Sequence, residues 1–257
     1  MKVVYIILLM TAFHFPIVYA DELFITFTDT DSEIILDGKW SNAHEWKKSS
    51  ETIITQDNKK SFALRYAHNY EQIFVLIDVV DDISANSLKD KSLLCFEAET
   101  TESSIIDESK IYCFEKMLDG NLVTLIKNME TLESSYKKIK NPPNVVATSG
   151  LSDQNDRYSK IPHISYEFQI PIDIIGRSNE YNVYVEVFDA ETNSIITWPS
   201  NPDVTESFLT NSTEWGKMIS PDKSIPEFPS PLIVFAILIV TILVIQLKLK
   251  TSLSNII

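Results

Sequence analysis

Residues 61–82 read SFALRYAHNYEQIFVLIDVVDD, and this stretch decides the fold. Phe62, Leu64 and Tyr66 alternate with smaller or polar residues, which is typical of a strand with one buried face. After a polar turn, residues 73–80 form a nearly continuous β-branched and aromatic run, which predicts a strand buried on both faces. Such a hairpin needs a second sheet to cover it.

The rest of the chain contains further short alternating segments that can supply this sheet. Asp119-Gly120 predicts a two-residue hairpin turn, whereas Pro142-Pro143 opposes regular structure within residues 130–156. Roughly ten strands with little helix predict an all-β fold, an antiparallel β-sandwich of the jelly-roll type. Besides the central hairpin, the expected strands are 23–28, 53–55, 92–97, 110–115, 122–126, 163–170, 181–189, 195–198 and 215–219.

Both ends of the chain have the composition of membrane-targeting segments. Residues 1–20 combine a charged start, an apolar core and a small-residue cleavage site, which predicts a secretory signal peptide; an uncleaved anchor is the alternative. Residues 232–247 are almost uniformly apolar and precede two lysines, which predicts one transmembrane helix with a short cytoplasmic tail, residues 248–257. We therefore expect residues 21–221 to form a domain on the extracellular face of the cell membrane.

The chain is acidic, with 36 acidic against 22 basic residues and a net charge of −14 at pH 7. Every acid lies between the two terminal segments. Such a surface repels nucleic acid and anionic lipid and favours cations or neutral ligands. A solvated acidic surface that keeps an exported domain soluble is the simpler explanation, and no nucleic-acid partner is expected.

The two cysteines are expected to form a disulfide. Cys95 and Cys113 each begin a Cys-Phe-Glu triplet, and a hairpin centred near Ser104 would place them opposite each other on adjacent strands. An exported domain lies in a compartment that permits disulfides. Two buried thiols are the alternative.

Five short motifs occur in an order and spacing that resemble those of family 9 carbohydrate-binding modules, part of the DOMON-like β-sandwich group. They read ILDGKWSNAHEW, RYAHNYEQIFVLIDVVDD, YEFQIPIDIIG, ITWPSNPD and EWGKM, and the resemblance spans residues 34–220. It implies sugar binding, generally beside domains that degrade polysaccharides. Trp40 departs from the pattern, which usually has a small or polar residue there. The matching positions are Asp37, Gly38, Trp46, Asp78, Asp81, Asp82, Glu167, Ile170, Pro171, Trp198, Trp215 and Gly216.

Sugar recognition needs flat aromatic faces for the C–H side of the ring and fixed polar groups for the hydroxyls. Trp40 lies in a polar loop, so we expect it to be exposed and, with Trp198, to stack on carbohydrate. Glu167 and the Asp81–Asp82 rim are the expected hydroxyl acceptors. The alternative for both tryptophans is that they only close the sandwich.

A structural calcium ion is the expected cofactor. Asp78, Asp81 and Asp82 crowd like charges at the end of the central strand, and hard oxygen ligands suit calcium. Members of the resembled family often carry this ion. Solvated loop acids are the alternative.

The sequence does not predict an enzyme, because it contains none of the catalytic motifs sought. It has no Gly-x-Ser-x-Gly, no phosphate loop and no His-Glu-x-x-His. Related sandwiches of the same broad group bind haem, so a haem-binding electron-transfer domain is the second hypothesis. A structural envelope or adhesion domain is the third. The candidate axial haem ligands are His68, His163, Met117, Met129 and Met218.

Residues 222–231 form a proline-rich linker before the apolar span. With that span and its lysines, the linker resembles the PEF-type C-terminal sorting signal of archaeal surface proteins. The resemblance implies cleavage by a membrane sortase and attachment to lipid; simple single-span anchoring is the alternative. In an outward-facing domain, Asn211 of an Asn-Ser-Thr sequence is a candidate glycosylation site. The sorting motif consists of Pro226, Glu227, Phe228 and Pro229.

Overall fold

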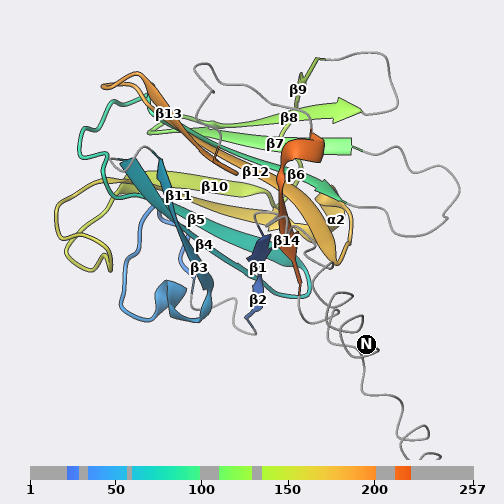
Figure 1. The fold of residues 1–257 in the computed structure, drawn as a ribbon, viewed down its shortest axis with the longest axis horizontal. Helices are drawn as coiled ribbons and strands as arrows, with labels where there is room; N and C mark the ends of the chain where they lie inside the picture. Colours follow the sequence, from blue (N-terminus) through green and yellow to red (C-terminus); the bar gives the residue numbers. More distant parts are fainter. Residues whose placement is uncertain are drawn as a thin grey trace, which may run out of the picture. The chain divides into compact units, whose positions relative to one another are not determined.

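The computed structural model describes residues 22–28, 34–56, 60–98, 110–128, 135–200 and 212–220. All of these except Ser220 lie in one compact unit, which is built almost entirely of strands. Figure 1 shows the strands in two layers, in agreement with the predicted all-β sandwich.

The larger sheet is assembled around the long strand β12. Its strands are β1 (Glu22–Phe24), β6 (Lys91–Ala98), β7 (Lys110–Met117), β8 (Leu122–Asn128), β9 (Lys137–Ile139), β12 (Glu180–Asp189), β13 (Ser194–Trp198) and β14 (Gly216–Ile219). The strand order is β1-β14-β12-β6-β7-β8-β9, and β13 pairs with β12 beside this path. The predicted turn at Asp119-Gly120 joins β7 to β8, which pair antiparallel.

The smaller sheet is assembled around the hairpin that the sequence places at the centre. Its strands are β2 (Thr26–Phe27), β3 (Ser50–Gln56), β4 (Lys60–His68), β5 (Gln72–Val79), β10 (Val146–Leu151) and β11 (Ile164–Pro171). The order is β10-β11-β5-β4-β2, and β3 pairs with β4. The described helical segments are short: η1 (Glu45–Lys48), α2 (Ile172–Ile175) and η2 (Ser212–Glu214).

Strand β5 is buried on both faces, as its sequence predicts. Ile73, Val75 and Ile77 belong to the main core between the sheets. Phe74 and Leu76 point the other way and pack with Trp40 and Trp46 in a separate cluster. Alternation along the strand therefore gives the smaller sheet a second buried layer on its outer face.

The prediction of purely antiparallel sheets is wrong, because two edge pairs are parallel. The expected single strand 23–28 splits into β1, which pairs parallel with β14, and β2, which pairs parallel with β4. The chain changes sheets at Ile25, whose backbone N–H donates to the Ile219 carbonyl. This N-terminal segment lies on the edges of both sheets, and a long intervening chain permits parallel pairing.

Residues 130–156 contain more structure than Pro142-Pro143 suggests. Strand β9 pairs with β8 before the prolines, and β10 pairs antiparallel with β11 after them. Strand β10 reads VATSGL and lacks the β-branched or aromatic run by which the other strands are recognised. It forms on the edge of the smaller sheet, where pairing with β11 supplies the hydrogen bonds.

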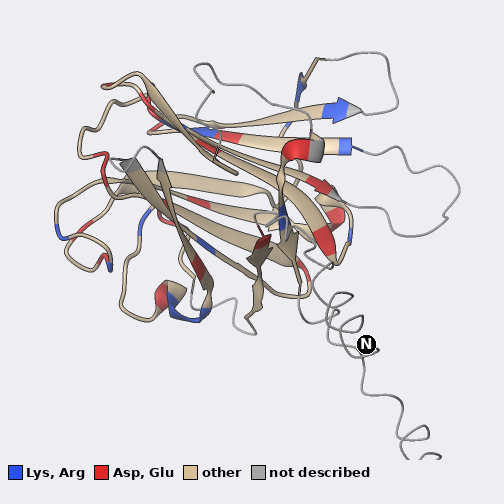
Figure 2. Ribbon diagram, viewed as in Figure 1, with Lys and Arg blue, Asp and Glu red and all other residues tan. Residues whose placement is uncertain are grey.

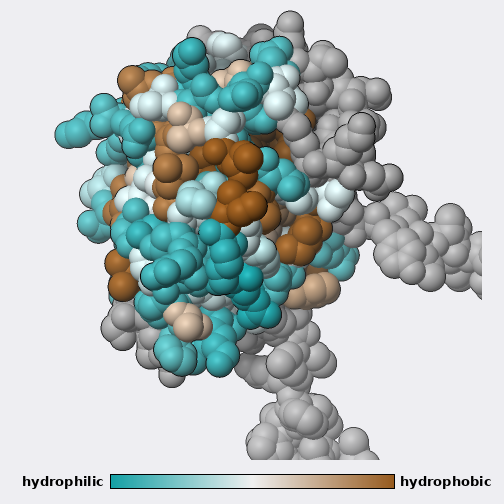
Figure 3. Space-filling view, turned by 90° about the vertical axis from the view of Figure 1, so that its left-hand side faces the viewer, coloured by the Kyte–Doolittle hydropathy of each residue, from teal (hydrophilic) through white to brown (hydrophobic). Residues whose placement is uncertain are grey.

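The end of the sandwich seen in Figure 3 is mostly hydrophilic, with apolar residues gathered near its middle. Among the described residues, the most exposed large hydrophobic side chains include Ile83, Leu88 and Ile161. All three lie in connections between strands rather than in a strand face.

The described part of the chain contains no helix that is long and apolar enough to cross a membrane. The predicted signal peptide, residues 1–20, and the predicted span, residues 232–247, lie outside the described residues.

Candidate functional site

The outer face of the smaller sheet carries an unusual set of buried polar groups. They come from alternate positions of β4, β5 and β11 and from His163 just before β11. The segments 34–49 and 152–163, named here the first and second covering loops, lie over them. The buried polar side chains on this face are Arg65, Asp78, His163, Ser165 and Glu167.

Glu167 fastens the first covering loop to the sheet. One carboxylate oxygen accepts the Gly38 backbone N–H at 2.7 Å, and the other accepts Trp46 Nε1 at 2.9 Å. The Gly38 carbonyl accepts the Ser165 hydroxyl at 2.6 Å. Gly38 has a φ of 91°, and an added Cβ would meet the Ser149 backbone at 2.3 Å, so only glycine fits. Burial raises the pKa of Glu167 to about 8, although both hydrogen bonds lower it.

Arg65 fastens the end of the same loop. Its guanidinium donates to the Trp46 carbonyl at 2.9 Å and forms an ion pair with Glu51 at 2.7 Å. It also donates to the Tyr158 hydroxyl at 2.6 Å, so it holds the second covering loop as well. The guanidinium carbon lies 4.9 Å from the centre of the Trp40 ring. One buried cation thus links both covering loops to β4.

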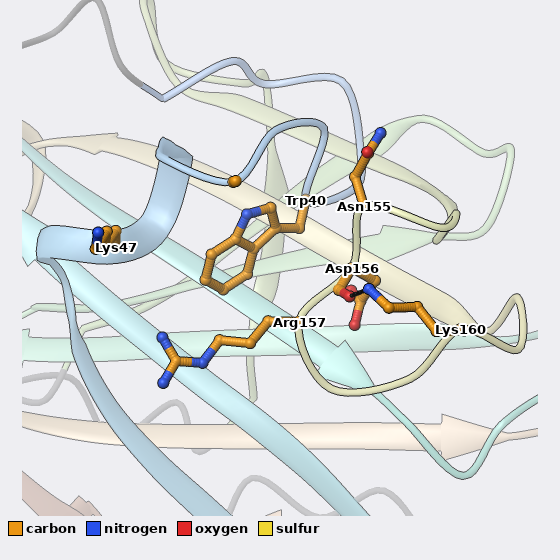
Figure 4. Close-up of a pocket in the computed structure, with 7 residues that line it drawn as sticks. Trp40, Lys47, Asn155, Asp156, Arg157 and Lys160 are labelled. Carbon is orange, nitrogen blue, oxygen red and sulfur yellow. Dashed lines mark hydrogen bonds between the residues drawn. The ribbon is translucent and has the colours of Figure 1, made fainter.

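A pocket of about 340 Å³ lies between the two covering loops. This volume is at the lower end of typical small-molecule sites. In the view of Figure 4, Lys47 lies to the left of Trp40, Arg157 lies below it, and Asn155, Asp156 and Lys160 lie to its right. The lining residues are Trp40, Ala43, Lys47, Asn155, Asp156, Arg157 and Lys160.

The lining is basic, although the chain is acidic overall. Figure 2 shows basic residues on η1 and on the second covering loop. Lys160 donates to the backbone carbonyls of Gln154 and Asp156. Within the described part of the chain, neither Lys47 nor Arg157 pairs with an acid. The pocket therefore offers two free cations and one amide beside an indole.

The structure separates the three aspartates that were expected to form one calcium site. Asp78 is buried on the outer face of the smaller sheet and contacts His163. Asp81 is exposed and accepts a hydrogen bond from Ser61. Burial raises the pKa of Asp82 to about 6, and nearby aspartates add to this rise. Asp82 lies with Asp90 and Asp189 in a second acidic group. Calcium binding stays a prediction.

The two tryptophans expected to stack on sugar are both buried. Trp40 is only 2 % exposed, so the expectation of an exposed Trp40 is wrong. The reason is the second covering loop, whose Tyr158 meets the Trp40 ring edge-on at 6.1 Å. Trp198 is 5 % exposed and packs in the main core, where a Cβ on Gly216 would collide with its ring. Trp40 still lines the pocket, whereas Trp198 does not.

The other predicted site residues are scattered. Glu167 is fully buried, and both of its oxygens already accept hydrogen bonds. Among the haem-ligand candidates, Met218 is buried in the main core, and His163 uses both ring nitrogens in the buried cluster. His68 and Met117 are half-buried in β4 and β7. Met129, Asn211 and residues 226–229, for which the sequence predicts roles, lie outside the described residues.

The predicted disulfide is confirmed. Cys95 and Cys113 lie directly opposite each other on β6 and β7 and form the bond. It sits on the outer face of the larger sheet, beside Tyr184 and Trp215, whose rings stack at 5.7 Å.

Of the seven residues that line the pocket, the sequence identified only Trp40 and missed Ala43, Lys47, Asn155, Asp156, Arg157 and Lys160. The last four lie in the stretch that matches none of the recognised motifs or immediately follow it. A run of polar residues between β10 and β11 is the only sequence signal, and it does not distinguish a binding loop from an ordinary connection.

The fold and site together define a two-sheet β-sandwich with a small basic pocket under loops on one outer face. No protein-family model matches the chain, and a comparison with curated proteins finds no match. Among solved structures, the chain is similar to a family 9 carbohydrate-binding module from Caldicellulosiruptor kristjanssonii in complex with cellotriose. The TM-score is 0.43 with 9% sequence identity, over 77% of this chain and 93% of that one. A likeness at this level assigns no function.

Proposed function

We propose that this chain binds carbohydrate without cleaving it, and that the ligand is an acidic saccharide held in the pocket between the two covering loops. The observation that carries the proposal is the pocket lining, in which Lys47, Arg157 and Asn155 occur together with Trp40. Unpaired cations favour a carboxylate or sulfate, and an amide suits hydroxyls. The sequence resemblance to carbohydrate-binding modules supports the choice of a sugar.

We also propose that the domain is displayed on the outer face of a membrane. The support is the sequence alone: an N-terminal segment with the composition of a signal peptide and an apolar segment at 232–247. Mass spectrometry of the mature termini tests how the chain is processed, because a retained residue 1 together with an unprocessed C-terminus would contradict cleavage of a signal peptide and cleavage by a sortase.

Titration calorimetry of the purified chain with an acidic oligosaccharide and a neutral one of equal length tests the ligand class. We expect affinity for the acidic saccharide on the order of micromolar to millimolar, weakening as salt is added. Lys47→Gln and Arg157→Gln should each lower this affinity roughly tenfold, since a hydrogen bond to a charged group contributes about 1.5–3 kcal/mol.

Lys138→Gln is the matched control, because Lys138 is exposed on β9, outside the pocket lining. The Lys138→Gln variant should bind the acidic saccharide with the same affinity as the unaltered chain. Equal binding of both saccharides, unaffected by Arg157→Gln, would show that this pocket is not the site. Absence of any binding on a glycan array that includes uronate and sulfated sugars would overturn the proposal. Alanine at Trp40 is a poor test, because Trp40 is buried and its loss would destabilise the covering loops.

A further inference from the structure

Three fully buried side chains meet at one point beneath the second covering loop. Asp78 comes from β5, and His163 and Asp156 come from the C-terminal end and the middle of the loop. Their ligand atoms all lie within 4.8 Å of one another. His163 Nε2 is 2.5 Å from Asp78 Oδ1 and 3.8 Å from Asp156 Oδ2.

The surroundings orient the His163 ring so that Nε2 points at the two carboxylates. Nδ1 lies 2.8 Å from the Ile161 carbonyl and 2.8 Å from the Ser152 hydroxyl. A carbonyl oxygen only accepts, so Nδ1 carries a proton and donates it. This is the arrangement in which a histidine presents Nε2 to a metal while an outer partner fixes its tautomer.

Each carboxylate keeps one oxygen without a hydrogen-bond partner. Asp156 Oδ1 accepts the backbone N–H groups of Tyr158 at 2.7 Å and Ser159 at 3.0 Å. Asp156 Oδ2 and Asp78 Oδ2 are buried and accept none. An unpaired buried carboxylate oxygen is costly, so both oxygens call for a positively charged partner.

We propose that Asp78, Asp156 and His163 bind one divalent cation of the zinc class. One imidazole nitrogen and two carboxylate oxygens suit zinc, whereas calcium takes oxygen ligands almost exclusively. Two ligand atoms of a tetrahedral zinc site are about 3.4 Å apart, and the observed 2.5 and 3.8 Å lie on either side of this value. The ion displaces the proton shared by His163 and Asp78.

A metal ion bound at this site would hold the second covering loop against the smaller sheet. The metal would join Asp156, in the middle of the loop, to Asp78 in the sheet. Asp156 is also one of the residues that line the pocket. The metal proposal does not depend on saccharide binding, because the saccharide proposal assigns no role to the side chains of its three ligands.

Metal binding to the full-length chain, purified in detergent and stripped with a chelator, tests the proposal. Zinc titrated against a chromophoric competitor should bind one ion per chain and raise the melting temperature, while calcium should not. Cobalt should give the d–d absorption of a nitrogen–oxygen site. Hydrogen exchange of residues 152–163 should slow when zinc is present.

Asp156→Asn is the decisive variant, because an amide oxygen at the Oδ1 position still accepts from Tyr158 and Ser159 and keeps the loop turn. It should bind zinc at least tenfold more weakly, as should His163→Gln. Asp189→Asn, in the other acidic group, should bind as the unaltered chain does. Equal zinc affinity in Asp156→Asn, or no cobalt absorption in the unaltered chain, would overturn the proposal.

Discussion

The outer faces of the two sheets are covered in different ways. On the smaller sheet, the covering loops are held by buried polar groups, with Arg65 and Glu167 contacting backbone atoms of the loops. On the larger sheet, the Cys95–Cys113 disulfide joins neighbouring strands under the stacked rings of Tyr184 and Trp215. The larger sheet also buries Glu186, which accepts the Tyr184 hydroxyl.

The disulfide and the buried polar side chains restrict different parts of the structure. A disulfide stabilises chiefly by restricting the unfolded chain, and it sets little about the loops above it. A buried ion contributes little net stability compared with apolar packing, but it fixes the position of the groups that satisfy it. The covering loops lie on the face where positions are fixed in this way, and the pocket lies between them.

Replacing Arg65 should produce the largest effect. Arg65→Met fills similar space but leaves the Trp46 carbonyl, the Tyr158 hydroxyl and Glu51 without their cation. We expect a loss of about 3–5 kcal/mol of unfolding free energy, measured by urea denaturation, because a buried polar group left without its partner costs about 1–3 kcal/mol. Saccharide affinity should fall as well, since both covering loops lose an anchor.

Arg177→Met provides the control, because Arg177 is exposed and, among the residues that the structure describes, donates only to the Tyr70 carbonyl. Its unfolding free energy should change by no more than about 0.5 kcal/mol. If Arg65→Met and Arg177→Met changed the unfolding free energy equally, the buried contacts of Arg65 would not be what holds the covering loops on the smaller sheet.

Removing the disulfide should have the next largest effect. The double variant Cys95→Ala and Cys113→Ala frees a loop with a sequence separation of 18, which should lower the unfolding free energy by roughly 3 kcal/mol. Native-state hydrogen exchange in residues 34–49 and 152–163 should stay unchanged, because the bond lies on the opposite face. Faster exchange in these loops would show that the two faces are coupled.

The sequence predicted the features that follow from periodicity and spacing. Alternation identified the β4–β5 hairpin, and the matching triplets around Cys95 and Cys113 identified the disulfide. It did not predict the covering of Trp40, because that depends on a loop more than a hundred residues later in the chain. The pocket escaped prediction for the same reason: Lys47 and Arg157 come together only through tertiary contacts.

The two groups of acidic residues are a second case in which the sequence did not predict tertiary contacts. Consecutive residues at a strand end point in different directions, so Asp81 and Asp82 cannot act together merely because they are neighbours. Asp78 finds its partners in the second covering loop, and Asp82 finds its partners in Asp90 and Asp189. Sequence proximity suggested one site where the fold makes two groups.

The smallest expected effect is the pH dependence of the unfolding free energy. It reports on Glu167, the buried acid under the first covering loop. The pKa of Glu167 rises from 4.5 to about 8 on folding, chiefly because burial disfavours the charged carboxylate. Between these values the folded chain keeps a proton that the unfolded chain has released, so the unfolding free energy falls as pH rises from about 4.5 to 8.

Glu167→Gln removes this titrating group while keeping its shape, so the comparison of the two chains separates Glu167 from the other buried acids. Between pH 5 and 6.5 the unaltered chain should lose on the order of 2 kcal/mol more unfolding free energy than the variant, measured in urea. At low pH the variant should be the less stable chain, because its amide nitrogen cannot accept the Gly38 or Trp46 N–H that a neutral carboxyl still accepts. Equal pH slopes would mean that Glu167 stays ionised in the folded chain, held by the N–H groups of Gly38 and Trp46. In that case a buried negative charge on Glu167 would hold the first covering loop on the smaller sheet. The contrast between the two outer faces would then be larger, because the smaller sheet would bury an ionised carboxylate as well as the Arg65 guanidinium.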